Sequence, residues 1–229
     1  MRVEDFIRRF RVAVADVARE VSGKDDYFWS DTEIVEYLNE AVQEACERAK
    51  LIEDRATPAV CTITLEPGKS SYDLHRSVLQ VKRLVFRGRV LEETSVEELD
   101  CSHGAWETRS GMPRYWVFDG ANSRGTPRIR LVPTPVEAGE IALTVYRGAL
   151  KPIDPCNTQA QPEIHERFHM RLMDWMLHRA YLKQDADAFD PAKAATSLAL
   201  FDQAFGQRID ANVQRKHRDR RPPRVRFRW

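Results

Sequence analysis

The amino-acid sequence predicts an α+β protein in which both ends of the chain form helices and the middle of the chain forms strands. Three observations predict this class. Apolar residues recur at helical spacing near both ends of the chain, whereas in the middle they alternate with polar residues. The final segment, 215–229, is rich in arginine and nearly free of apolar residues, so it cannot bury enough surface to fold alone.

The arrangement of these segments predicts one helical domain built from both chain ends. We expect a four-helix-type bundle with an antiparallel β sandwich or barrel inserted between its halves. The predicted boundaries are 1–57 and 158–213 for the helical bundle domain, 58–157 for the inserted β domain, and 214–229 for a basic, extended C-terminal arm.

The N-terminal helices are predicted as a hairpin. The first carries an apolar stripe and ends at Ser22-Gly23; the stripe is Phe6, Phe10, Val14, Val17 and Val21. The second begins at Ser30, because Ser30 and Glu33 have the spacing of a capping box. Its stripe is Ile34, Leu38, Ala41, Ala45 and Ala49.

The middle of the chain predicts five or six short strands separated by turns. Gly-containing turns are expected at Pro67-Gly68, Arg87-Gly88 and Asp119-Gly120. The predicted strands lie at 61–65, 81–86, 89–94, 114–118, 128–131 and 141–146. Short strands at this spacing are typical of a small antiparallel sandwich or barrel.

Two further helices are predicted after the strands. Pro162 suits the first turn of the third helix, where the missing N–H costs nothing, and Asp190-Pro191 is a start signal for the fourth. The stripe of the third helix is Ile164, Phe168, Leu172, Met176 and Ala180, and that of the fourth is Leu198, Phe201, Phe205, Ile209 and Val213.

Composition excludes several classes of protein. No apolar run approaches the length of a membrane span, and charges fall where the apolar stretch of a signal peptide would lie, so neither a membrane protein nor export is expected. The cysteines Cys46, Cys61, Cys101 and Cys156 are widely separated and include no Cys-x-x-Cys pair. This usage fits reduced thiols in a cytosolic setting better than disulfides or structural zinc.

A zinc-hydrolase motif occurs at His165-Glu166-Arg167-Phe168-His169. Its spacing places both imidazoles on one helix face, where they could hold zinc while Glu166 activates a water. A third protein ligand is required, but the extended motif would need Gly and His where Leu172 and Trp175 stand. Other side chains that could serve are Asp174, His178, Asp185 and Asp187. We interpret the histidines as flanking a packed apolar stripe, and expect no metal, cofactor or catalytic residue.

The basic segment at the C-terminus carries eight Lys/Arg and one acid between Arg215 and Trp229. It could bind nucleic acid through phosphate contacts, act as a solubilising end, or lie as an arm across another protein. Pro222-Pro223 would stiffen such an arm, and its alternation of arginines with apolar residues is typical of an added β-strand. The residues expected to bind a partner are Arg215, Arg218, Arg220, Arg221, Arg224, Arg226, Phe227, Arg228 and Trp229.

Several strings of the sequence, in this order of elements, resemble the head-to-tail adaptor (connector) proteins of tailed bacteriophages, particularly podophages and their tail-tubular relatives. The strings are 31–41, 71–74, 111–116, 129–135, 139–147 and 162–172. In these families a Pro-x-Ile-x-x-x-(Tyr/Phe)-His string opens the third helix. That string matches Pro162, Ile164, Phe168 and His169, which would account for the histidines without zinc.

The resemblance implies a structural virion protein without enzymatic activity. It implies a ring, commonly of twelve copies, seated beneath the portal vertex, with helical domains as the wall and β domains facing the tail. The implied partners are the portal protein, a tail or nozzle protein, further copies of the chain, and genomic DNA passing through the channel, with no membrane. The protein would lie at the head–tail junction of the virion, and in the host cytoplasm before assembly. The C-terminal arm would reach the portal, as in some relatives.

Overall fold

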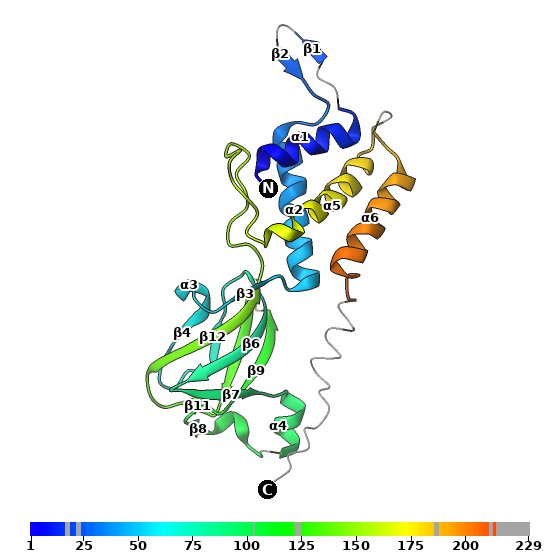
Figure 1. Ribbon diagram of the computed structural model, residues 1–229. Helices are drawn as coiled ribbons and strands as arrows, with labels where there is room; N and C mark the ends of the chain where they lie inside the picture. The colour runs from blue at the N-terminus through cyan, green and yellow to red at the C-terminus, as the bar shows by residue number, and fades with distance from the viewer. Residues whose placement is uncertain are drawn as a thin grey trace. The chain divides into compact units, whose positions relative to one another are not determined.

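The computed structural model describes residues 1–16, 19–21, 24–102, 104–121, 125–185, 188–210 and 213 (Figure 1). The α+β class is confirmed: these residues form six α-helices and an eight-stranded sheet. The chain divides into two compact units. The first is Met1–Ile52 with Arg147–Arg208; the second is Glu53–Tyr146.

The first unit is helical. Its helices are α1 (Val3–Val14), α2 (Asp31–Ala49), α5 (His169–Tyr181) and α6 (Pro191–Phe205). Helix α5 packs on all three others, and α1 also contacts α2. The buried core between them includes Phe6, Phe10, Ile34, Leu38, Leu172, Met176 and Phe201. Most of the predicted apolar stripes are therefore buried where the helices meet.

The first predicted helix is shorter than its stripe suggested. Helix α1 ends at Val14, since Ala15 adopts a left-handed conformation at its C-cap. Predicting helix as far as Ser22-Gly23 was wrong, because a short hairpin of β1 (Arg19–Val21) and β2 (Lys24–Asp26) follows. Val17, Ser22 and Gly23 lie outside the described residues. The start of α2 is as predicted: the Ser30 hydroxyl accepts a hydrogen bond from the backbone N–H of Glu33.

The last two helices also differ from the prediction at one end each. Helix α5 begins at His169, after the 3₁₀ turn η2 (Glu166–Phe168), and not near Pro162. Glu163 instead binds Arg147 and the backbone N–H of Leu150, which holds this stretch outside the helix. Helix α6 ends at Phe205 because Gly206 leaves helical geometry at φ 84°. Two residues of its predicted stripe, Ile209 and Val213, are consequently exposed.

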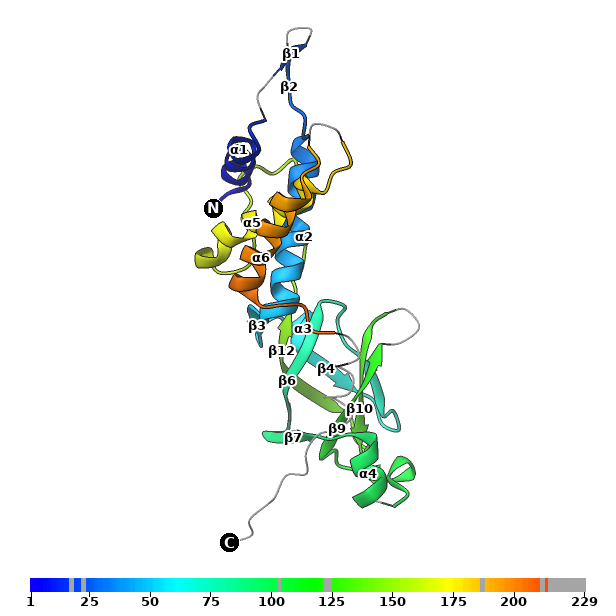
Figure 2. The ribbon, with the colours of Figure 1, turned by 90° about the vertical axis from the view of Figure 1, so that its right-hand side faces the viewer.

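The second unit is a curled sheet of eight strands in the order β3-β12-β6-β7-β9-β10-β5, with β4 paired to β12 (Figure 2). The strands are β3 (Ile52–Asp54), β4 (Thr62–Leu65), β5 (Ser71–Asp73), β6 (Val78–Phe86), β7 (Arg89–Glu93), β9 (Tyr115–Ala121), β10 (Pro127–Val132) and β12 (Gly139–Arg147). Short helices α3 (Pro58–Cys61) and α4 (Val96–Ser102), the 3₁₀ turn η1 (Trp106–Thr108), and the paired strands β8 (Ser110–Gly111) and β11 (Thr134–Pro135) complete it.

The prediction of a purely antiparallel sandwich or barrel was wrong in two respects. The strands form one curled sheet, a half-barrel, rather than two packed sheets. The sheet is also mixed, because β7 pairs with β9 in parallel. Parallel neighbours need a long crossover, and the segment that contains α4 and η1 supplies it. Strand β9 continues through Asp119-Gly120, where a turn was predicted, with Gly120 at φ 81° beside a register shift.

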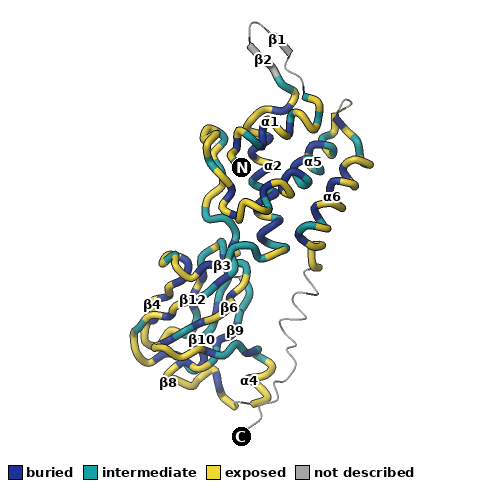
Figure 3. Tube along the Cα trace, in the orientation of Figure 1, coloured by how far each residue is buried: buried dark blue, intermediate teal, exposed yellow. Residues whose placement is uncertain are grey.

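Burial follows the sheet's two faces and the helix stripes (Figure 3). Along β12, Ile141, Leu143 and Val145 are buried in alternation with more exposed residues, as the sequence predicted. Strand β3 lies beside β12 in the sheet, so the strands at the two ends of the inserted segment are neighbours. Among the described residues no helix is both long and apolar enough to cross a membrane.

Candidate interaction surfaces

The predicted partner-binding residues lie outside the described part of the chain. These are Arg215, Arg218, Arg220, Arg221, Arg224, Arg226, Phe227, Arg228 and Trp229. Their role remains a prediction. The structure describes the end of α6, from which the chain continues toward these residues.

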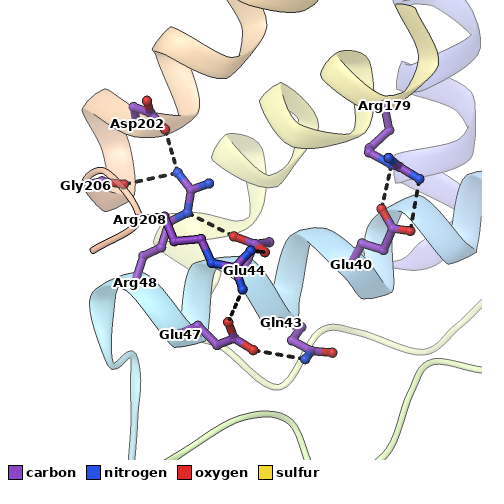
Figure 4. Close-up of polar contacts among 9 residues, drawn as sticks. All are labelled: Glu40, Gln43, Glu44, Glu47, Arg48, Arg179, Asp202, Gly206 and Arg208. Carbon is purple, nitrogen blue, oxygen red and sulfur yellow. Dashed lines mark hydrogen bonds and ion pairs between the residues drawn. The ribbon is translucent and has the colours of Figure 1, made fainter. Parts of the chain in front are cut away.

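A buried arginine fastens the end of α6 to α2 (Figure 4). The side chain of Arg48 is 6% exposed, and its guanidinium binds the carboxylates of Asp202 on α6 and Glu44 on its own helix. It also donates to the carbonyl oxygen of Gly206 at 3.2 Å, which satisfies a backbone acceptor at the helix end. The same guanidinium lies 5.0 Å from the ring centroid of Phe201. One side chain thus pairs with two carboxylates and caps a helix.

Arg208 extends this contact beyond the helix. Its guanidinium lies 3.3 Å from a carboxylate oxygen of Glu44 and 3.4 Å from one of Glu47 (Figure 4). The chain that continues toward the arm is therefore held against α2 as far as Arg208.

The two histidines of the zinc-hydrolase motif have separate structural roles. His169 is buried, and its Nε2 donates to the carbonyl oxygen of Ile164 at 2.9 Å. Its Nδ1 accepts from the backbone nitrogen of Met1 at 2.8 Å, so both ring nitrogens are occupied. His165 precedes the helix, and its Nδ1 accepts from the backbone N–H of Arg167. Within the described ranges, no group of three or more His, Cys, Asp and Glu side chains could hold a metal ion.

The pKa of His169 is lowered, first by burial, which penalises the charged imidazolium. Burial similarly raises the pKa of the Cys46 thiol to about 12, which makes it unreactive at neutral pH. Cys61 is also buried, whereas Cys101 and Cys156 are exposed.

The outer face of α6 is exposed and carries no charge over two helical turns. From Ala194 to Phe201 the helix has no ionisable residue. Its exposed residues are Pro191, Ala192, Lys193, Ala195, Thr196, Ala199, Leu200 and Gln203. Surface helices normally carry charged residues on the solvent side, so this face is unusually apolar. This face was not predicted from the sequence, although the charge-free run is visible in it.

A groove lies beside α1, on another part of the helical unit. It has a cavity volume of about 570 Å³. Its lining is Glu4, Ile7, Arg8, Arg11, Val12, Ala15, Asp16, Tyr27, Asp31 and Thr158. Val12 is 78% exposed, and the Arg11 guanidinium covers the Tyr27 ring at 3.5 Å from its centroid. An apolar strip bordered by charges of both signs is typical of a protein–protein interface.

A family model described as SU10 adaptor protein matches residues 1–227. The chain belongs to the SU10 adaptor protein family. This is a family of phage head–tail adaptors, which are structural proteins and not enzymes. No curated protein matches the chain.

Because the chain belongs to the SU10 adaptor family, its exposed surfaces can be interpreted as those of a structural adaptor. The resemblance found in the sequence is confirmed, and it covers nearly the whole chain. The family implies a place at the head–tail junction and partners within the virion. For a structural adaptor, surfaces that bind other proteins are the functional sites, so the uncharged face of α6, the groove beside α1 and the C-terminal arm are the candidates.

Proposed function

We propose that this adaptor forms a ring that connects the portal vertex to the tail. The ring stabilises the packaged head and extends the channel through which genomic DNA passes. The observation that carries the proposal is the match of the SU10 adaptor model over residues 1–227. In a closed cyclic ring every copy makes the same two lateral contacts, so modest contacts add up to a stable assembly.

In this proposal α1, α2, α5 and α6 act as one bundle made by both chain ends, and these bundles form the wall of a ring of twelve copies. The inserted sheet faces the tail or nozzle protein. The packing of α5 on α1, α2 and α6 supports the bundle. The neighbouring positions of β3 and β12 support a β domain inserted at one point of that bundle.

The C-terminal arm binds the portal in this proposal. Its arginines pair with acidic portal groups, and Phe227 and Trp229 are its apolar anchors. Support comes from the sequence of the arm and from Arg208, which contacts Glu44 and Glu47 of α2 in the last described stretch before the arm.

Deletion of Arg215–Trp229 tests the portal contact. We expect the shortened protein to fold, with an unchanged circular dichroism spectrum, and to lose binding to purified portal rings in sedimentation. A second variant, with Phe227 and Trp229 replaced by Ala, keeps all the arginines and separates anchoring from charge. If the shortened protein binds portal rings with the affinity of the full chain, the arm is not the portal contact.

The same experiment distinguishes nucleic-acid binding by the tail. A nucleic-acid contact through arginines would weaken steeply as salt rises and would occur with DNA in the absence of portal. Loss of DNA binding in the shortened protein, without loss of portal binding, would favour that alternative.

A further inference from the structure

We propose that the uncharged outer face of α6 binds the groove beside α1 of a second copy of this chain, in a head-to-tail manner. This inference rests on the proposed ring and deepens it, because it names the two faces that meet between neighbouring copies.

The first support is the composition of the exposed side of α6. Leu200 is 42% exposed, and it lies among small or uncharged exposed residues with no charge between Lys193 and Asp202. Small side chains such as those of Ala195 and Ala199 allow another helix to approach closely. An uncharged outer face does not stabilise a helix that stays exposed to water. It does stabilise a helix whose outer face is covered by a partner.

The second support is that α6 is held rigidly at both ends. At its start the Asp190 carboxylate accepts from the backbone N–H of Lys193. At its end Arg48 binds Asp202 and the Gly206 carbonyl oxygen. A face that is fixed before association loses little conformational entropy when it binds, which favours affinity.

The third support is the groove beside α1, which offers a matching surface. Ile7, Val12 and Ala15 give it apolar lining, and its volume of about 570 Å³ is large enough to receive several side chains of a helix face. Its charged lining comprises three carboxylates and two guanidiniums (−3 + 2 = −1): Glu4, Asp16, Asp31, Arg8 and Arg11. Lys193, whose side chain pairs with Asp190 and is still 63% exposed, lies at the border of the α6 face and complements this net negative charge.

The fourth support is the position of the two faces within the helical unit. Both α1 and α6 pack on α5, and they lie on either side of it (Figure 1). Two different faces on opposite sides of one body give a heterologous contact, which repeats from copy to copy and closes into a ring when the rotation allows. Contact of α6 with α6 would instead give an isologous pair and leave the groove beside α1 without an occupant.

Cysteine cross-linking tests the pairing directly. The exposed Cys101 and Cys156 are first replaced by Ser, while the buried Cys46 and Cys61 are kept. Val12→Cys and Leu200→Cys are then made in separate chains, mixed, assembled on portal rings and treated with a short bis-maleimide. We expect a cross-linked dimer from the mixture only, and a ladder of higher species when both substitutions are in one chain.

Each result of this experiment decides a different point. Cross-linked dimers from Leu200→Cys alone would show an isologous contact through α6 and overturn the inference. Complexes that form on the portal without any cross-link would also overturn it, while the proposed ring would stand. Failure of the unsubstituted chain to form a discrete complex with portal would overturn the proposed function and this inference together.

A charge substitution provides a second readout. Leu200→Lys keeps helix propensity and places an ammonium in the proposed contact. We expect lateral association, measured by analytical ultracentrifugation of the full chain, to weaken about tenfold or more. The matched control is Leu182→Lys, because Leu182 is 39% exposed at the end of α5 and lies outside both faces. Equal association of the two variants would contradict the proposal.

Discussion

At the scale of single residues, His169 is a buried polar group whose ring nitrogens both have a hydrogen-bond partner. His169 lies in the helical core, where its two ring nitrogens bind the Ile164 carbonyl oxygen and the Met1 nitrogen. Such a group must be satisfied, since a buried polar atom without a partner costs free energy. The tautomer with the proton on Nε2 fits both contacts, because a carbonyl oxygen can only accept.

The buried environment of His169 predicts that this residue makes the stability of the protein depend on pH. The pKa of His169 is lowered in the folded protein by burial, whereas an unfolded histidine titrates near about 6.5. Below that value the unfolded chain binds a proton that the native site resists, so stability falls as pH falls. We expect His169→Gln to reduce this slope, measured as the free energy of unfolding in urea between pH 5 and pH 8.

The matched control is His165→Gln, which leaves His169 in place. It should retain the slope of the unsubstituted protein. An unchanged slope in His169→Gln would show that another group governs the acid response.

At the scale of secondary-structure elements, the ends of helices are set by contacts that come from elsewhere in the chain. The first backbone N–H groups of α1 donate to carbonyl oxygens of Thr158 and Ala160, from a distant loop. That loop is in turn fixed by Asn39 of α2, whose amide makes two hydrogen bonds to the backbone of Ile153. The end of α6 is held by Arg48 from α2.

Removal of the Arg48 side chain should loosen α6 from α2. Arg48→Ala leaves Asp202 without its buried partner and frees the Gly206 carbonyl oxygen. Loss of one partner of a buried ion pair typically costs about 3 kcal/mol. We expect a loss of that order in the free energy of unfolding, measured by urea denaturation, with earlier hydrogen exchange in α6 than in α2.

Arg8→Ala is the matched control, because the Arg8 side chain is 72% exposed in its pair with Asp5. An exposed ion pair contributes much less than a buried one. Equal losses in the two variants would contradict the assigned role of Arg48.

At the scale of the whole molecule, the chain is organised as a helical unit interrupted by a sheet. The interruption begins and ends with neighbouring strands, β3 and β12. Insertions are tolerated where their two ends lie close together, because the host unit then needs little rearrangement. The second unit has its own buried residues, among them Leu65, Leu84, Leu99, Trp116, Ile129 and Leu131.

The second unit should therefore fold by itself. We expect a protein of residues 53–146 to unfold cooperatively on heating, with well-dispersed amide signals in NMR spectra. A broad, non-cooperative transition would show that the sheet depends on the helical unit.

The sequence by itself determined the class of the fold and the family. Helical spacing identified the buried stripes of α2 and α5, Ser30 and Glu33 marked the start of α2, and alternation identified β12. These signals are local, because each depends on residues within one or two turns or along one strand. The strings of residues that resemble phage adaptors were also readable without coordinates.

Only the tertiary structure decided the limits of the helices, the parallel pairing of β7 with β9, and the roles of Arg48 and His169. Each depends on partners that are far away in the chain, such as Asp202 for Arg48 and Met1 for His169. Local spacing contains no information on such partners. The uncharged face of α6 and the groove beside α1 likewise became recognisable as surfaces only when packing showed which side of each helix is covered.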